Sequence, residues 1–439
     1  MGVVGTARLS WGRVPAAAPR RIVAPVSRSA PVDWPSEGTV LGYGLGRSYG
    51  DSCLNSGQTL VCSRWLDRLI AFDAGSGALT CEAGVSLEQI LGFSLPRGWF
   101  LPTTPGTQFV TLGGAIANDV HGKNHHAAGS IGHHVDSLEL LRSDGSRIRV
   151  SRVDTPALFA ATVGGLGLTG FITEATLRLR KVRGPWIEQT VRRFRSLEEF
   201  FEVDAQLKPS FEHTVAWVDC VAPRGQLGRG LYMAGNHTDD AGAAPARRRL
   251  AMPVQAPFSL VGRLTLRAFN ALYFNRPLPR GPHRVHYQPF FYPLDAILDW
   301  NRIYGPRGFY QFQCVVPPAE SRRALTKLLQ LIAASGAGSF LAVLKTFGQL
   351  ASEGILSFPR PGTTLALDFP NHGQATDRLF RSMEEVALEA GGALYPAKDA
   401  HMTAAAFRAG YPRWEAMLPH IDPRVSSNFW RRVTGAVEP

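Results

Sequence analysis

Apolar and polar residues alternate most regularly in the last third of the chain, from residue 310 onward. Positions with a period of two predict strands at 310–316, 339–345, 363–369 and 393–395. Two stretches between them repeat apolar residues at helical spacing, which predicts helices from Pro318 to about Gly336 and over 377–390. The order strand, helix, strand, strand, helix, strand is typical of a ferredoxin-like element.

The period of two also divides the side chains of these strands between two faces. One face of the strands at 310–316 and 363–369 carries Gln311, Gln313, Thr364, Ala366 and Asp368. Because uncharged amides are costly to bury without partners, the pattern predicts a sheet with one core face and one polar face. The polar face either lines a pocket or meets bulk water, and the pattern alone leaves both open.

The first part of the chain mixes hairpins with short helices. DAGSG between two apolar runs predicts a hairpin over 69–83, and SDG predicts a second hairpin over 137–152. Ser86 is a candidate N-cap for a helix, and another short helix is predicted over 154–162. This mixture predicts an α+β domain that ends where a basic Gly-Pro stretch interrupts the pattern at 181–186.

Glycine recurs in GLGRSYGD at 44–51 and again in the long stretch 101–135. A backbone with few side chains can lie against a flat or charged group and present N–H donors to it. No helix follows the first cluster, as a Rossmann dinucleotide motif requires, so we reject that motif and predict a phosphate loop between strands. The second stretch is predicted to wrap the diphosphate and ring of a flavin dinucleotide.

The formal net charge of +12 suits a phosphorylated substrate, another polyanion or an anionic membrane surface. An arginine-rich surface without a dedicated partner fits the charge equally well. Residues 238–285 combine arginines with aromatic and aliphatic residues. This composition predicts a mobile insertion that acts as a lid or membrane-surface contact, or a poorly ordered loop with a short amphipathic helix.

The five cysteines are odd in number and never spaced as CxxC. This argues against a disulfide framework and a zinc site and favours a reducing compartment. We see no signal peptide in the first part of the chain and no run of about eighteen apolar residues that would span a membrane. We expect a protein that is cytoplasmic or peripheral at the inner membrane, with the periplasmic face left open.

Seven segments in chain order resemble the vanillyl-alcohol oxidase and p-cresol methylhydroxylase type of FAD-binding oxidoreductases, and more closely their decaprenylphosphoryl-β-D-ribose 2'-oxidase branch. They are GLGRSYGD at 44–51, TPGT at 104–107, GGAIANDVHGKNHHAAGSIGHHV at 113–135, GLGLTGFI at 165–172, YPLDAILDWNRIYG at 292–305, YQFQ at 310–313 and LYPAKDA at 394–400. The resemblance implies a two-part FAD-binding domain, residues 1–183 and 391–439, and an inserted substrate domain over 184–390 on an antiparallel sheet.

The resemblance also implies which residues hold FAD. They are Gly44, Gly46, Arg47, Ser48 and Tyr49 in the first loop, Gly106, Thr107, Gly113, Gly114, Asn118, His121 and Gly122 in the second, and Gly170, Ile172 and Tyr395 elsewhere. Tyr49 stands near the place where many members of the superfamily attach FAD through a histidine. We therefore expect noncovalent FAD, and we expect no metal.

Oxidation of a secondary alcohol needs a hydride acceptor and a group that removes the hydroxyl proton. The candidate bases are His121, Tyr49 and Lys398; a histidine titrates nearest neutrality, and Lys398 is also the candidate for stabilising negative charge on the flavin. By resemblance, the substrate contacts are Lys123, Arg302, Gln311, Gln313, Lys345, Thr364 and Ala366. Thr364 and Ala366 replace an asparagine and a reactive cysteine of the mycobacterial members, so inhibitors that trap that cysteine should not bond here.

The resemblance thus implies FAD-dependent oxidation of the 2'-hydroxyl of decaprenylphosphoryl, or another polyprenylphosphoryl, β-D-ribose to the 2'-keto sugar. This is the first half of an epimerisation that supplies an arabinose donor for cell-wall or surface glycans. A quinone or oxygen would accept the electrons, and an NAD(P)H-dependent keto-reductase would complete the reaction. The alternatives are a soluble sugar, alditol or aldonolactone oxidase of the same fold, and a flavin- or glycan-binding protein without turnover. We expect no nucleic-acid partner.

Overall fold

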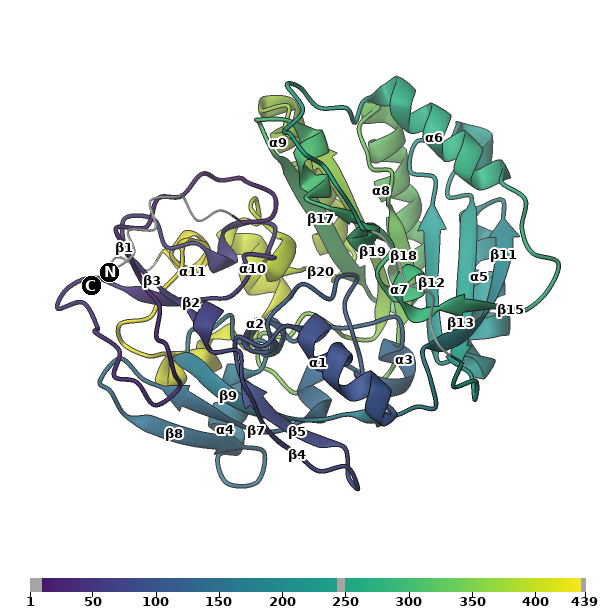
Figure 1. Cartoon of the computed structure of the whole chain (residues 1–439). Helices are drawn as coiled ribbons and strands as arrows, with labels where there is room; N and C mark the ends of the chain where they lie inside the picture. Colours follow the sequence, from purple (N-terminus) through teal and green to yellow (C-terminus); the bar gives the residue numbers. More distant parts are fainter. Residues whose placement is uncertain (1–9, 243–248, 436–439) are drawn as a thin grey trace.

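The structure is a computed structural model that describes residues 10–242 and 249–435. Two large antiparallel sheets lie side by side, and helices α1 (Leu87–Ser94) and α2 (Leu112–Ala117) lie between them (Figure 1). This arrangement is a mixed α and β fold, in agreement with the predicted class.

The first large sheet has five strands in the order β4-β5-β9-β7-β8, and all neighbouring strands are antiparallel. The strands are β4 (Leu69–Phe72), β5 (Ala78–Glu82), β7 (Val135–Leu141), β8 (Arg147–Ser151) and β9 (Phe171–Arg178). β4–β5 and β7–β8 are the two predicted hairpins. The predicted N-cap is also confirmed, because Ser86 Oγ accepts a hydrogen bond from the backbone N–H of Gln89 at 3.2 Å and so fixes the start of α1.

A small parallel sheet brings distant parts of the chain together. Its strands, in the order β1-β3-β2, are β1 (Arg21–Val23), β3 (Thr59–Cys62) and β2 (Val40–Tyr43). Val40 also forms a bridge with Val425, and α11 (Asn428–Thr434) contacts the short turn at Asp51–Cys53. Residues 425–434 therefore pack against the first glycine-rich segment, whereas α10 (Ala404–Gly410) contacts the strand at 393–394 that precedes it.

The second large sheet has eight strands in the order β15-β11-β13-β12-β18-β19-β17-β20, all antiparallel. The strands are β11 (Trp186–Phe194), β12 (His213–Val218), β13 (Gly230–His237), β15 (His283–His286), β17 (Phe309–Val316), β18 (Val343–Phe347), β19 (Gly362–Pro370) and β20 (Ala393–Leu394). The sheet draws its strands from residues 186–394, so its last strand, β20, lies just beyond residue 390, where the resemblance implies that the inserted domain ends.

Helices cover one face of the eight-stranded sheet and leave the other toward the glycine-rich loops (Figure 1). The covering helices are α5 (Leu197–Leu207), α8 (Ser321–Ser335) and α9 (Gln374–Glu389), whereas α6 (Arg263–Asn275) packs through Phe274 against Trp217 and Leu231, which alternate with the residues that α5 covers. Phe312 and Cys314 of β17 are buried in the same apolar cluster as Leu328 of α8 and Phe380 of α9. Because strand side chains alternate, Gln311 and Gln313 point to the opposite face.

The observed elements over 309–394 follow the predicted order, with one clear difference in bounds. The strand predicted at 339–345 begins only at Val343. The hydroxyl of Ser339 accepts from the N–H of Leu341 and donates to the carbonyl of the same residue, both at 3.0 Å. These bonds keep the residues before Val343 out of the extended conformation, so pairing with the sheet begins only at Val343.

The predicted insertion contains ordinary secondary structure where it is described. After β13 the chain forms β14 (Leu250–Ala251), then α6, and then β15, and β14 pairs in parallel with β16 (Ile297–Leu298). Residues 243–248 of this insertion lie outside the described residues. None of the helices in the described chain is long and apolar enough to cross a membrane.

Candidate functional site

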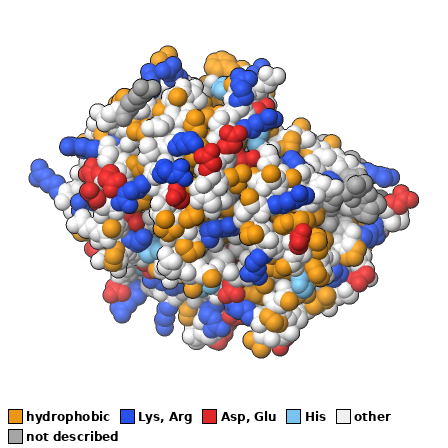
Figure 2. Space-filling view, turned by 180° about the vertical axis from the view of Figure 1, so that it is seen from behind, with side chains coloured by type: hydrophobic (Ala, Val, Ile, Leu, Met, Phe, Trp, Pro, Cys, Tyr) orange, Lys and Arg blue, Asp and Glu red, His pale blue; other side chains and the backbone are white. Residues whose placement is uncertain are grey.

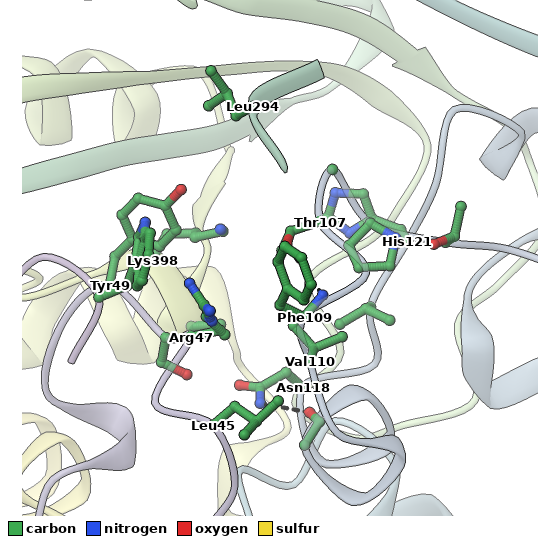
Figure 3. Close-up of a pocket in the computed structure, with 18 of the residues that line it drawn as sticks. Leu45, Arg47, Tyr49, Thr107, Phe109, Val110, Asn118, His121, Leu294 and Lys398 are labelled. Atoms are coloured by element: carbon green, nitrogen blue, oxygen red, sulfur yellow. Dashed lines mark hydrogen bonds between the residues drawn. The ribbon is translucent and has the colours of Figure 1, made fainter. Parts of the chain in front are cut away.

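A cavity of about 540 Å³ lies between the glycine-rich loops and the polar face of the eight-stranded sheet. In Figure 3, Arg47, Tyr49 and Lys398 lie on one side of it, and Thr107, Phe109 and His121 lie on the other. The lining includes every predicted cofactor and catalytic residue and all predicted substrate residues except Arg302. The volume is within the usual range of ligand sites.

One side of the cavity, the loop wall, is formed by residues 44–50, 104–107 and 113–123. Its loops approach one another closely, and glycine is what permits this. A Cβ atom on Gly44 would lie 2.5 Å from Thr111 Oγ1, and a Cβ on Gly50 would lie 1.7 Å from the carbonyl oxygen of Asp399. Any side chain at either position would push the loops apart.

The loop wall also carries hydrogen-bond donors that the described chain does not use. The backbone N–H groups of Gly46, Arg47, Ser48, Gly106 and Thr107 meet no acceptor within the described residues. The buried Nε of Arg47 likewise has no partner there, and its guanidinium lies 3.9 Å from the ring centre of Trp11. A Cβ on Gly106 would meet no described atom within 4 Å, so that position is open on the cavity side. Unused donors beside a cation fit the diphosphate of a dinucleotide.

Gly113 and Gly114 have a different role from the one expected. The N–H of Gly113 donates to the carbonyl of Ala83 at 2.8 Å, and the N–H of Gly114 donates to Thr111 Oγ1 at 3.1 Å. Both donors are therefore occupied within the protein. A Cβ on Gly113 would lie 3.0 Å from the Cβ of Ala83, so this glycine serves close packing of α2.

The opposite side, the strand wall, is formed by Gln311, Gln313, Lys345, Thr364 and Ala366. Cross-strand pairing places them on one face, because Lys345 is opposite Thr364 and Ala366 is opposite Gln313. Gln313 and Thr364 are buried. The polar face thus lines a pocket and does not meet bulk water, which decides between the two alternatives left by the sequence.

His121 joins the two walls. The amide nitrogen of Gln313 donates to Thr364 Oγ1 at 3.2 Å and lies 3.3 Å from His121 Nε2. This contact makes Nε2 the acceptor and leaves the proton on the buried Nδ1, which has no partner among the described residues. Burial, and next the charge of Lys345, lower the pKa of His121 well below its usual value, so the ring is neutral near pH 7.

Three lysines surround the cavity, and each has a depressed pKa. Burial lowers the pKa of Lys123 to about 7 and that of Lys345 to about 7, the latter with help from the charges of Lys123 and Lys398. The Nζ of Lys345 donates to the carbonyl of Gly122 at 3.1 Å, and the Nζ of Lys123 donates to the carbonyl of Phe290. Buried ammonium groups without carboxylate partners favour a bound anion.

Lys398 is the exception, because it has an acidic neighbour. Its Nζ lies 3.8 Å from the ring centre of Tyr49, and it is coupled to the buried carboxyl of Asp368, which accepts from Gln311 Nε2 at 2.6 Å. Burial raises the pKa of Asp368 and lowers that of Lys398. The pair can therefore hold its proton on either member. Asp368 was on the predicted polar face but was not among the predicted site residues.

The sequence alone would suggest that Asp399 pairs with the adjacent Lys398, but the structure shows other partners for Asp399. Arg432 of α11 binds Asp51 through Nε and Nη2, both at 2.8 Å, and Asp399 through Nη2 at 2.9 Å. Both carboxylates are buried. This ion triad connects the first glycine loop, the loop that carries Lys398 and α11.

Arg302 lies away from the cavity lining. Its Nη1 donates to the carbonyls of Met252 and Pro253 at 2.6 and 3.1 Å, and its Nη2 pairs with Asp299 at 3.2 Å. The guanidinium therefore holds the segment after β14 in place, and the expectation that it contacts substrate is corrected. No sequence pattern indicates these partners, since two of them are the backbone carbonyls of Met252 and Pro253.

Two buried aspartates that the sequence analysis missed hold the loop wall. Asp295 accepts from the backbone N–H of Gln108 at 2.9 Å. Asp119, which has a positive φ of 42°, accepts from Ser130 and Ser357 at 2.9 and 2.6 Å. Asp119 thereby ties the loop that carries His121 to the loop between β18 and β19. No motif in the sequence marks either contact.

A match to a known protein family indicates the class of this protein. A family described as an FAD binding domain matches residues 36–151, which contain the loop wall. With the unused donors described above, this match identifies an FAD-dependent oxidoreductase.

The similarity to individual proteins extends over nearly the whole chain. Decaprenylphosphoryl-beta-D-ribose oxidase from Mycolicibacterium smegmatis is 36% identical over 448 residues, which cover 94% of this chain and 94% of that protein. A protein from Streptomyces coelicolor, described only as uncharacterized and in the mprA 5' region, is 33% identical and covers 75% of this chain and 92% of its own length. Probable L-gulonolactone oxidase 6 from Arabidopsis thaliana is 31% identical over only 28% of this chain. The chain therefore belongs to the decaprenylphosphoryl-β-D-ribose oxidase family.

Proposed function

We propose that the protein uses FAD to oxidise the 2'-hydroxyl of a polyprenylphosphoryl β-D-ribose to the 2'-keto sugar. The observation that carries this proposal is the set of half-buried lysines, Lys123, Lys345 and Lys398, that line a cavity with a polar strand wall and an apolar end. The cations suit a phosphate ester, the amides and hydroxyl suit a sugar, and the apolar end suits a prenyl chain. The named relative that covers the whole chain acts, by its name, on such a substrate.

The loop wall supplies the residues that would hold FAD noncovalently. The N–H groups of residues 46–48 and 106–107 and the guanidinium of Arg47 would bind the diphosphate. Tyr395, whose hydroxyl donates to the carbonyl of Asn118 at 2.8 Å, would keep the second loop in place beside the ring. When bound there, FAD supplies the hydride acceptor that an alcohol oxidation requires.

Among the three candidate bases, the contacts favour Lys398. Burial, and next the charge of Asp368, raise the pKa of Tyr49 well above its usual value, so the phenol keeps its proton. Nε2 of His121 is occupied by Gln313, and its pKa is depressed. Lys398 has a depressed pKa, so a neutral amine is available near pH 7 to take the hydroxyl proton, and the resulting ammonium lies beside the carboxylate of Asp368.

The strand wall would orient the sugar and the phosphate. Gln311, Gln313 and Thr364 offer amide and hydroxyl groups to the ribose, while Lys345 and Lys123 would bind the phosphate. The proton on Nδ1 of His121 is a further donor for the sugar. Ala366 offers no nucleophile, so a reagent that bonds to a cysteine at this place in a relative would not bond here.

The division of the chain follows from the same arrangement. We propose an FAD-binding domain formed by residues 1–183 and 391–439, with residues 184–390 as the substrate domain. The eight-stranded sheet and the packing of α11 against the first glycine loop support these limits. The strand order β18-β19-β17-β20 with α8 and α9 on one face supports a ferredoxin-like element, whose last strand, β20, is supplied by the chain just after residue 390.

The keto sugar implies two further partners. A quinone or oxygen would remove the electrons from the flavin, and an NAD(P)H-dependent keto-reductase would convert the product to the arabinose epimer. On the face seen in Figure 2, lysine and arginine side chains are scattered among acidic ones and do not form one basic stripe. This face therefore lacks the basic stripe that is typical of nucleic-acid binding.

The decisive experiment is anaerobic addition of polyprenylphosphoryl ribose to the yellow protein, followed through the visible absorbance of the flavin. Bleaching by this substrate, and none by free alditols or lactones, is the expected result. Bleaching only by the free sugars would instead assign a soluble sugar oxidase, and no bleaching by any sugar would assign a binding protein. Acid precipitation should leave the flavin in the supernatant, and flavin in the pellet would overturn noncovalent binding.

A further inference from the structure

The segment from residue 241 to residue 294 has charge of only one sign. It contains no aspartate or glutamate, and its cations are eight arginines: Arg247, Arg248, Arg249, Arg263, Arg267, Arg276, Arg280 and Arg284. The whole chain has 35 acidic residues, so their absence from this segment is a local feature. A surface of this kind attracts anions without internal compensation.

The same segment exposes large apolar side chains. In the described chain, seven such side chains are more than 60% exposed, and five of them are Leu250, Val254, Phe258, Leu264 and Leu272. The other two, Val26 and Val153, lie in the first part of the chain. Scattered apolar residues are normal on a surface, but a concentration within one short segment marks an interaction site.

Helix α6 is apolar on two faces. Its inner face buries Leu266 and Phe274 against the eight-stranded sheet, while Leu264 and Leu272 on the outer face are 81% and 76% exposed. Residues eight apart share one side of a helix, so the two exposed leucines form a single ridge. This apolar ridge on the outer side of α6 has no covering partner among the described residues.

The segment also borders the cavity. Tyr273 of α6, with its ring centre 4.7 Å from that of Trp217, lines the cavity together with Met233 and Leu341. The stretch before α6 is held by the N–H of Leu260, which donates to the carbonyl of Ile303 at 2.9 Å. The apolar end of the cavity therefore borders the helix that carries the exposed ridge. In Figure 1, α6 lies on the outer rim of the molecule, away from both chain ends.

We propose that Val254, Phe258, Leu264 and Leu272, with Arg263, Arg267 and Arg280 around them, form a docking face for an anionic lipid bilayer. This proposal rests on the proposed function, because it makes α6 the place where a prenyl chain passes from the bilayer into the apolar end of the cavity. The apolar side chains enter the acyl region, and the arginines meet lipid phosphates. Charge of one sign, together with a lipid-compatible cavity beneath the ridge, favours a bilayer over a protein partner.

The test is cosedimentation of the FAD-loaded protein with vesicles of equimolar phosphatidylcholine and phosphatidylglycerol. The double variant Leu264→Glu, Leu272→Glu should bind more weakly by about tenfold per leucine, because burial of each side chain is lost and a negative charge is added. Val153→Glu is the matched control, since Val153 is 87% exposed and lies outside the segment. The control should bind as the wild type does, and vesicles of phosphatidylcholine alone should bind all three proteins weakly.

Equal binding of the double variant and the wild type, or no binding of the wild type, would overturn the docking face. Loss of a dimer on a sizing column by the double variant, with vesicle binding unchanged, would assign the ridge to a second copy of the chain. Activity gives a separate result. With a water-soluble, short-prenyl substrate the double variant should reduce its flavin at the wild-type rate, and only the long-chain substrate in vesicles should react more slowly. Failure of both substrates with the wild type would refute the proposed function and leave the vesicle result intact.

Discussion

The two walls of the cavity offer a ligand different kinds of groups. The loop wall offers mainly the backbone N–H groups of residues 46–48 and 106–107, which do not titrate. The strand wall and the lysines beside it act through side chains whose pKa values are moved by burial. The affinity for the cofactor should therefore be insensitive to pH near neutrality, while the affinity for the substrate should change with pH.

The largest expected effect comes from removing the proton acceptor between the walls. Lys398→Met should slow anaerobic flavin reduction by about 10²- to 10⁴-fold, the usual range for loss of a general base, with FAD still bound. The measurement is single-turnover bleaching. Lys327→Met, which removes a lysine from an exposed pair with Glu389, is the control and should react at the wild-type rate. Wild-type reduction by the Lys398 variant would remove this residue from the mechanism.

Arg432→Leu should destabilise the loop wall, although Arg432 lies in α11 and not in the wall itself. This change leaves the buried carboxylates of Asp51 and Asp399 without their cation, which costs about 3–5 kcal/mol in the free energy of unfolding. Urea unfolding measures the loss, and the variant should also release FAD more readily. Arg322→Leu, at an exposed pair with Glu198, should cost about 0–1 kcal/mol. Similar losses in the two variants would mean that the triad does not hold the wall.

Lys345→Met tests whether the charge of this lysine makes ligand binding at the strand wall depend on pH. In the free enzyme the ammonium of Lys345 is lost as the pH rises through a pKa of about 7, so polyprenyl phosphate should bind best below pH 7. Loss of a charge-assisted contact worth about 1.5–3 kcal/mol should weaken binding by about 10- to 100-fold at pH 6. The dissociation constant of this unreactive ligand is measured from pH 6 to pH 8. A variant curve as steep as the wild-type curve would contradict the role given to Lys345, and FAD affinity should be flat in both.

The smallest effect is expected at Ala366, where the strand wall faces the cavity. Ala366→Cys should change the free energy of unfolding by less than about 1 kcal/mol, because the position is only half-buried and borders open space. The new thiol should react with a maleimide, and polyprenyl phosphate should protect it. The natural Cys314 on the neighbouring strand is buried and faces the helices, so it provides the internal control. A thiol that reacts equally with and without ligand would place Ala366 outside the substrate path.

The sequence predicts features that depend on local pattern. Glycine spacing indicated the loop wall, and the period of two placed Gln311 and Gln313 on one face with no knowledge of what that face meets. The resemblance supplied the roles of His121 and Lys398, which neither spacing nor composition could provide. The cavity lining contains all of these residues.

Long-range contacts of side chains were not predictable in the same way. Arg432 and Asp51 are separated by 381 residues, and nothing in either segment indicates the other. Asp399 follows Lys398 directly, so proximity in sequence suggested a pair, yet adjacent side chains point in different directions and each found a distant partner. Arg302 was misplaced for the same reason, since its partners are backbone carbonyls that leave no mark in the sequence.

The ion triad has a consequence for how the protein is made. Asp51 leaves the ribosome long before Arg432, because 381 residues separate them in the order of synthesis. During that interval the first glycine loop has neither its cation nor the packing of α11. We therefore expect FAD to bind late in biogenesis, and a nascent chain stalled before residue 432 should remain colourless although it already contains every glycine of the loop wall.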